Sequence, residues 1–71
     1  MCRSIVDLRR MEPPAGREEA EAAARQFVRK VSGFREPSKA NAEAFERAVV
    51  AIADITDELL DDLVVRGQPI R

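Results

Sequence analysis

The stretch that decides the fold is Phe27 to Asn41, which reads Phe-Val-Arg-Lys-Val-Ser-Gly-Phe-Arg-Glu-Pro-Ser-Lys-Ala-Asn. It lies between two patterns whose apolar residues recur every three or four positions, which is the spacing of amphipathic helices. A chain of 71 residues has room for one small core. We therefore predict that the two helices pack together as an antiparallel hairpin, with the turn at residues 34–38.

The first helix is expected from about residue 17 to residue 32. Gly16 is a tolerable cap, and the acids that follow it favour the positive end of the helix dipole. Gly33 fits the left-handed residue just past a helix, and Phe34 is placed to fold back onto Val28 as in a Schellman ending. The face predicted to be buried comprises Ala20, Ala23, Ala24, Phe27, Val28 and Val31.

The second helix is expected from about residue 39 to residue 66. Pro37 blocks continuation from the turn, and Ser38 can accept a hydrogen bond from the free amides that open the helix, with Asn41 as the rival cap. Gly67 is expected to close the helix. Its apolar stripe comprises Phe45, Ala48, Val49, Ile52, Ile55, Leu59, Leu60 and Leu63.

The residues before the first helix form a predicted arm that ends at Pro13 and Pro14. Because the second helix is the longer one, the antiparallel hairpin leaves part of its stripe uncovered, namely Ile55, Leu59, Leu60 and Leu63. Either the arm residues Ile5, Val6, Leu8 and Met11 or a second subunit should cover this part. The fold class is all-α, a single domain divided into an arm (1–15), helix one (16–33), a turn (34–38), helix two (39–66) and a tail (67–71).

Composition excludes several classes of function. The net charge of −1, from 12 basic and 13 acidic residues, gives no reason to expect a nucleic-acid-coating protein. No segment approaches the roughly 18 apolar residues of a membrane span, and the first residues do not form a secretory signal, so a cytoplasmic protein without membrane contact is expected. The chain has no histidine and one cysteine, which excludes imidazole-based catalytic pairs, an intramolecular disulfide and a cysteine-cluster zinc site. We expect no enzyme and no cofactor.

A run of carboxylates crowds the second half of helix two, where the helix dipole disfavours acids. The run comprises Asp54, Asp57, Glu58, Asp61 and Asp62. One straight helix rarely supplies the converging oxygen ligands that a metal needs, so we expect a solvated or paired surface and no metal site. The arm residues Arg3, Arg9 and Arg10 are the expected basic partners.

The first candidate site is an anion-binding site at the turn. Four cations surround the free amides that open helix two, and two hydroxyls lie beside them, an arrangement that suits a phosphate. The residues are Arg29, Lys30, Ser32, Arg35, Ser38 and Lys39. The simpler alternative is that Arg29 and Lys30 complement the negative end of helix one.

The second candidate is the thiol of Cys2, the only cysteine. If Met1 is removed, a free amine and a thiol share one residue, and Arg3 can lower the pKa of the thiol. Such a pair can bind a metal or attack an electrophile. The alternative is a small, partly buried apolar residue in the arm.

The chain also resembles a family of short, uncharacterised bacterial proteins. The likeness lies in Met1-Cys2-Arg3, Pro13-Pro14-Ala15, the segment Gln26 to Phe34 with its Val-Arg-Lys-x-Ser-Gly-Phe pattern, Pro37 to Asn41, Ala44-Phe45 and Arg47-Ala48-Val49. The resemblance covers nearly the whole chain. It implies a domain of unknown function and supplies no activity, substrate or catalytic residue.

These observations favour a small protein-interaction module, with a homodimer and an unidentified macromolecular partner as the expected associations. Anion or nucleic-acid binding at the basic turn is one alternative, and thiol or metal chemistry at Cys2 is the other.

Overall fold

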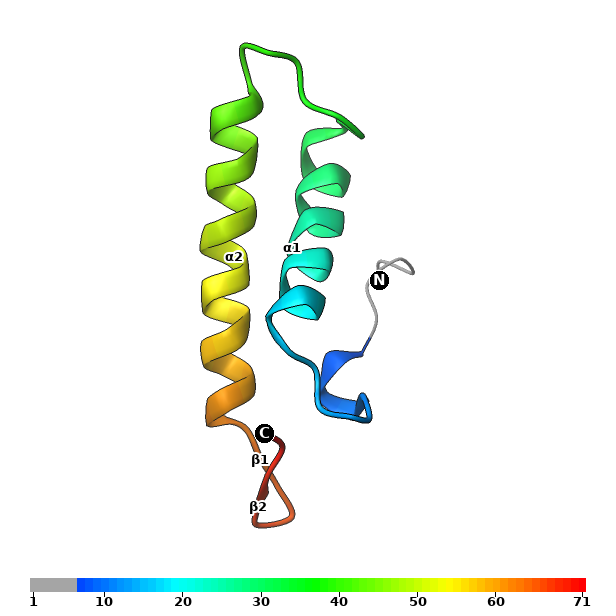
Figure 1. The fold of residues 1–71 in the computed structure, drawn as a ribbon, viewed down its shortest axis with the longest axis vertical. Helices are drawn as coiled ribbons and strands as arrows, with labels where there is room; N and C mark the ends of the chain where they lie inside the picture. The colour runs from blue at the N-terminus through cyan, green and yellow to red at the C-terminus, as the bar shows by residue number, and fades with distance from the viewer. Residues whose placement is uncertain (1–6) are drawn as a thin grey trace.

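The computed structural model describes residues 7–71, which form a helical hairpin with a short β-hairpin at its open end. Figure 1 shows the two helices antiparallel and side by side, with the connection at one end and the β-hairpin and residues 8–10 at the other. The molecule measures 46 × 21 × 18 Å. In chain order the elements are η1 (Leu8–Arg10), α1 (Arg17–Ser32), α2 (Ala42–Asp62), β1 (Val64–Val65) and β2 (Gln68–Pro69).

Helix α1 has the predicted bounds, but its two ends are built differently from each other. At the start, the Gly16 amide donates a hydrogen bond to Oε1 of Glu19 at 3.1 Å, which satisfies one of the free amides there. At the end, Gly33 adopts a φ of 77°, the left-handed conformation that glycine tolerates best. The left-handed stop predicted at this glycine is therefore confirmed.

The predicted Schellman ending is replaced by a simpler one. The amide of Gly33 donates to the carbonyl of Arg29 at 2.9 Å, which is the single bond of the left-handed motif. The amide of Phe34 donates instead to Oγ of Ser32 at 3.2 Å. Because the serine hydroxyl satisfies this amide, the second backbone bond of a Schellman motif is not needed.

Helix α2 begins three residues later than predicted. Its cap is Asn41, whose carbonyl accepts the first helical bond from Phe45 at 2.9 Å. Ser38 is not the cap. Its hydroxyl accepts a hydrogen bond from the side-chain amide nitrogen (Nδ2) of Asn41 at 2.9 Å. Residues 39–41 therefore form a turn that leads into the helix.

Helix α2 also ends earlier than predicted, at Asp62, so the expected helix to residue 66 is wrong. Val64 and Val65 are β-branched residues that favour strands, and β1 pairs antiparallel with β2. Arg66 and Gly67 have φ values of 54° and 78°, as a tight hairpin turn of type I′ requires. Gly67 thus serves a β-turn and does not cap a helix, and the fold is mainly helical without being purely α.

The core is small and lies between the facing sides of the two helices. In the described part of the chain it comprises Ala15, Ala20, Ala24, Val28, Phe45, Val49, Ala53 and Leu60. Half of these residues are alanines, which bring the helices close together but bury little apolar area. Neither helix described is both long enough and apolar enough to cross a membrane.

The described part of the arm, residues 7–15, packs at the open end of the hairpin. Leu8 and Ala15 line a small cleft together with Leu60 of α2 and Ile70. The arm therefore lies beside the end of the longer helix. The predictions for Ile5 and Val6 concern residues outside the described part of the chain.

Candidate functional site

The hairpin has two unlike flanks, and the first is closed by ion pairs between the helices. We call it the charged flank; it comprises Arg17, Glu21, Arg25, Glu46, Asp54, Asp57, Asp61 and Arg71. At the start of α1, Nη1 of Arg17 lies 2.7 Å from Oδ1 of Asp54 and 2.8 Å from Oδ2 of Asp57. Hydrogen bonds to Asp57 first, and then to Glu21 and Asp54, raise the pKa of Arg17 above its ordinary value.

Arg71 closes the same network from the other end of the chain. Its Nη2 lies 2.8 Å from Oδ1 of Asp57 and its Nη1 lies 3.0 Å from Oδ1 of Asp61. Its Nε donates to the carbonyl of Ala15 at 3.1 Å, so one guanidinium joins α2 to the arm. Hydrogen bonds from Arg17, and secondly from Arg71, hold the pKa of Asp57 below its usual value.

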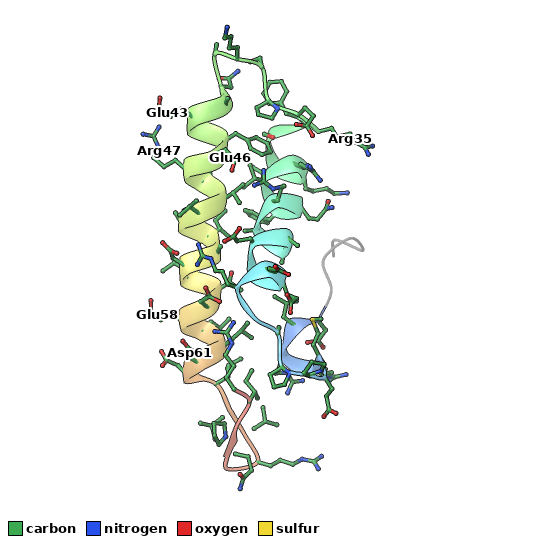
Figure 2. All side chains as sticks on the ribbon, viewed as in Figure 1. Arg35, Glu43, Glu46, Arg47, Glu58 and Asp61 are labelled. Atoms are coloured by element: carbon green, nitrogen blue, oxygen red, sulfur yellow. The ribbon has the colours of Figure 1, made fainter. Side chains whose placement is uncertain are left out.

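Closer to the turn on the charged flank, Arg25 of α1 and Glu46 of α2 form a bidentate ion pair. The two N···O distances are 2.5 Å and 3.0 Å, the geometry in which a guanidinium fits a carboxylate best. This hydrogen bonding lowers the pKa of Glu46. In Figure 2 Glu46 lies on the side of α2 that is turned toward α1, whereas Glu43, Arg47 and Glu58 point away from α1.

The partners of the acidic run differ from those predicted. Within residues 7–71 neither Arg9 nor Arg10 pairs with a carboxylate of α2, and Arg10 pairs instead with Asp7 at 3.2 Å. Arg3 lies outside the described residues. Arg17 and Arg71 take the predicted role, because the antiparallel register brings the first turn of α1 and the residues after β2 beside α2.

The second flank is apolar and open. Its upper half, toward the turn, is a cleft of about 320 Å³. Its lower half is a cleft of about 400 Å³ near the arm. Phe27 and Ile52 line both halves, so they form one continuous surface, which we call the apolar groove. The upper half is also lined by Val31, Phe34, Ala44 and Ala48, and the lower half by Leu8, Ala23, Leu59 and Leu63.

The groove exists because the apolar stripes are wider than one helix can cover. Phe27 immediately precedes the buried Val28, and Leu59 immediately precedes the buried Leu60, so each lies beside the contact face. Phe27 and Leu59 have relative exposures of 46% and 54%, and Val31 reaches 71%. The expectation that Phe27 and Val31 are buried within the hairpin is therefore wrong, since residues 7–71 leave a large part of both exposed.

The predicted uncovered set at the end of α2 is partly correct. Ile55 and Leu59 are exposed, whereas Leu60 is buried and Leu63 is half-buried beside the arm. The uncovered surface extends further toward the turn than predicted, because Ala48 and Ile52 also line the groove.

The residues of the predicted anion site lie at the tip of the hairpin, and three of them already bind neighbouring groups of the turn. Nε of Arg29 donates to the carbonyl of Arg35 at 3.0 Å, and Nη2 of Arg29 lies 3.8 Å from Glu36. The hydroxyls of Ser32 and Ser38 accept the local hydrogen bonds described above. Arg29 and both serines therefore stabilise the turn itself.

The other cations of this site, Lys30, Arg35 and Lys39, are exposed. Lys30 lies on α1, while Arg35 and Lys39 lie in the connection. Figure 2 shows Arg35 extending away from the helices. Cys2 and Arg3 lie outside the described residues, and no group of metal-binding side chains occurs within residues 7–71.

Comparison with known protein families shows to which family the chain is related. A family model described as "Uncharacterized conserved protein (DUF2277)" matches residues 1–71. The chain belongs to this family. DUF2277 carries no assigned activity, so the family adds no site residue to those described above. The comparisons with curated proteins and with solved structures give no match.

Proposed function

We propose that the chain is a small protein-interaction module that binds through the apolar groove. The observation that carries this proposal is the contrast between the flanks: ion pairs close one, while the other exposes Phe27, Val31 and Leu59 along a continuous surface. Contiguous apolar surface of this kind typically marks a site of association. Two helices with an open apolar seam are also the arrangement that accepts further helices in a bundle.

The small core supports the same proposal. A domain of this length is only marginally stabilised by its own burial, and half of this core is alanine. Each Å² of apolar surface removed from water contributes about 25 cal/mol, so covering the phenylalanine and leucine side chains of the groove adds stabilisation that the hairpin alone lacks. A partner seated in the groove would therefore stabilise the fold as well as bind it.

The test is site-specific photo-crosslinking of the full chain in cells. A benzophenone amino acid replaces Val31 in the groove or, as a matched control, Val50, which is also an exposed valine but lines neither half of the groove. Light should produce adducts with polypeptides, of this chain or of another, from position 31 and not from position 50. Ile52→Asp should abolish these adducts. Equal adducts at both positions, or none at position 31, would reject the proposal.

Binding of an anion or a nucleic acid at the basic turn stays a second prediction. Alanine at Lys30, Arg35 and Lys39, which are free of ion pairs within residues 7–71, should remove a salt-sensitive affinity while leaving the Arg29 contacts in place. An affinity that responds to neither salt nor these replacements would reject it.

Thiol or metal chemistry at Cys2 stays a third prediction. It requires a thiol with a depressed pKa, which rapid alkylation below neutral pH would reveal. Alkylation at the rate of an ordinary thiol would remove this case.

A further inference from the structure

We propose that the occupant of the apolar groove is a second copy of this chain, packed antiparallel across a two-fold axis that passes near Ile52. This inference rests on the proposed function of the groove and adds the partner and its direction. It is argued from the position of Ile52 and from the charges at the edges of the groove.

Ile52 lies where the two halves of the groove meet. In a two-fold dimer the residue nearest the axis contacts its own copy, and residues on either side contact each other in reverse order. An antiparallel copy therefore sets the alanine half of α2, with Ala44 and Ala48, against the leucine half, with Leu59 and Leu63. Small residues facing large ones allow the two surfaces to interdigitate.

Charges along the outer edges of the groove favour the antiparallel direction. On α2, Arg47 and Glu58 lie on the same side, pointing away from α1, at nearly equal separations before and after Ile52 (Figure 2). Reversal about Ile52 brings Arg47 of one copy to Glu58 of the other. Neither residue has an ion-pair partner among residues 7–71.

The edge of α1 repeats this arrangement. Lys30 lies toward the turn and Glu19 lies toward the open end, and neither has a cross-helix partner in the described chain. Their midpoint on α1 lies close to Ala24, which packs in the same core as Ala53, the neighbour of Ile52. One axis therefore brings opposite charges together on both helices.

A parallel dimer would have the opposite result. In that arrangement α1 of one copy lies on α2 of the other at the same height, so that Lys30 approaches Arg47 and Glu19 approaches Glu58. Like charges that face each other across an interface disfavour association. The charge pattern thus selects the antiparallel arrangement.

The first experiment measures the dissociation constant of the purified full chain by sedimentation. We expect a dimer whose constant rises more than about 100-fold in Ile52→Asp, because a carboxylate would be buried at the axis, and little in the control Val50→Asp. A monomeric mass at every concentration up to the millimolar range would overturn the second copy. Polypeptide adducts from position 31 would then still uphold the proposed function, with another protein as the partner.

The second experiment reverses the edge charges. Arg47→Glu should weaken the dimer by roughly tenfold, and adding Glu58→Arg should restore it. In a parallel dimer Arg47→Glu would instead strengthen association, because it would face Lys30. That outcome, or a failure of the double variant to recover, would overturn the antiparallel arrangement.

Distances between spin labels test the arrangement without altering the edge charges. Labels at residue 40, in the Cys2→Ser background, should lie about 36 Å apart along the helix direction, because Ala40 is displaced from the axis at Ile52 in opposite directions in the two copies. Labels at residue 51 should lie close together. Short distances at both positions would indicate a parallel dimer and reject the proposal.

Discussion

Nη1 of Arg17 lies 2.8 Å from Oδ2 of Asp57, and this contact ties the first turn of α1 to the open end of α2. A hairpin is covalently joined only at its turn, so its other end depends on contacts between side chains. Asp57 uses its second oxygen to hold Arg71 at 2.8 Å. One carboxylate therefore joins three segments that are distant in the sequence.

Asp57→Asn should reduce the free energy of unfolding by about 1 kcal/mol, because it removes the charge that two arginines share. The matched control is Asp54→Asn, which removes only one arginine contact from a side chain that is 63% exposed, compared with 22% for Asp57. The control should lose only a few tenths of a kcal/mol. Urea unfolding of both variants at one protein concentration measures the difference, and equal losses would contradict the central role of Asp57.

Stability should fall in acid, and part of the fall should be traceable to Asp57. Its folded pKa is below the ordinary value of 3.8, so the unfolded chain binds the proton more readily. The contribution of Asp57 is therefore fully present above the unfolded pKa and is lost as the pH falls through the folded one. The difference in stability between the wild-type chain and Asp57→Asn should shrink below about pH 4. A difference that stays constant down to pH 2 would show that Asp57 does not titrate with folding.

Serine should have opposite effects at two glycines. At Gly33, whose φ is 77°, it should cost about 1 kcal/mol, because a side chain is strained in the left-handed region although no other atom crowds it. At Gly16, whose φ is −104°, the backbone is extended and a serine hydroxyl can cap α1, so a gain of a few tenths of a kcal/mol is expected. Thermal unfolding of both variants gives the two signs. A loss at Gly16 would show that its amide contact with Glu19 needs the absence of a side chain.

Local signals predict the turn and helix α1 well. Gly33 stops a helix through its own backbone preference, and Pro37 prevents continuation, so neither depends on distant residues. The end of α2 is different, because Leu63 continues the helical spacing of apolar residues. The strand preference of Val64 and Val65, followed by Arg66 and Gly67 as turn residues, is the signal that identifies the β-hairpin.

The residues that meet on the two flanks are harder to predict, because they depend on how the helices pack against each other. Arg17 and Asp57 are 40 positions apart, and only the register between the helices brings them together. The apolar stripe containing Phe27 and Val31 indicates burial, but helical spacing does not say against what. Because a hairpin has only two layers, the outer part of each stripe stays open, and the groove appears where a larger fold would have a core.

The close approach of the helices should make the core intolerant of larger side chains. Ala53 has no exposed surface and packs in the same cluster as Ala24 and Val49. Ala53→Leu should therefore push the helices apart and cost about 1 to 3 kcal/mol. Ala51→Leu is the matched control, since Ala51 lies two residues away on the same helix and is exposed; it should change stability by less than about 0.5 kcal/mol.

Separation of the helices should also weaken the pair between Arg25 and Glu46. Its two hydrogen bonds, at 2.5 Å and 3.0 Å, would lengthen as the helices move apart. In Ala53→Leu, replacement of Glu46 by Gln should then change stability less than it does in the wild-type chain, and a double-mutant cycle measures this coupling. If the cycle shows no coupling, the alanine core and the charged flank stabilise the hairpin independently, and the spacing between the helices is not set by Ala53.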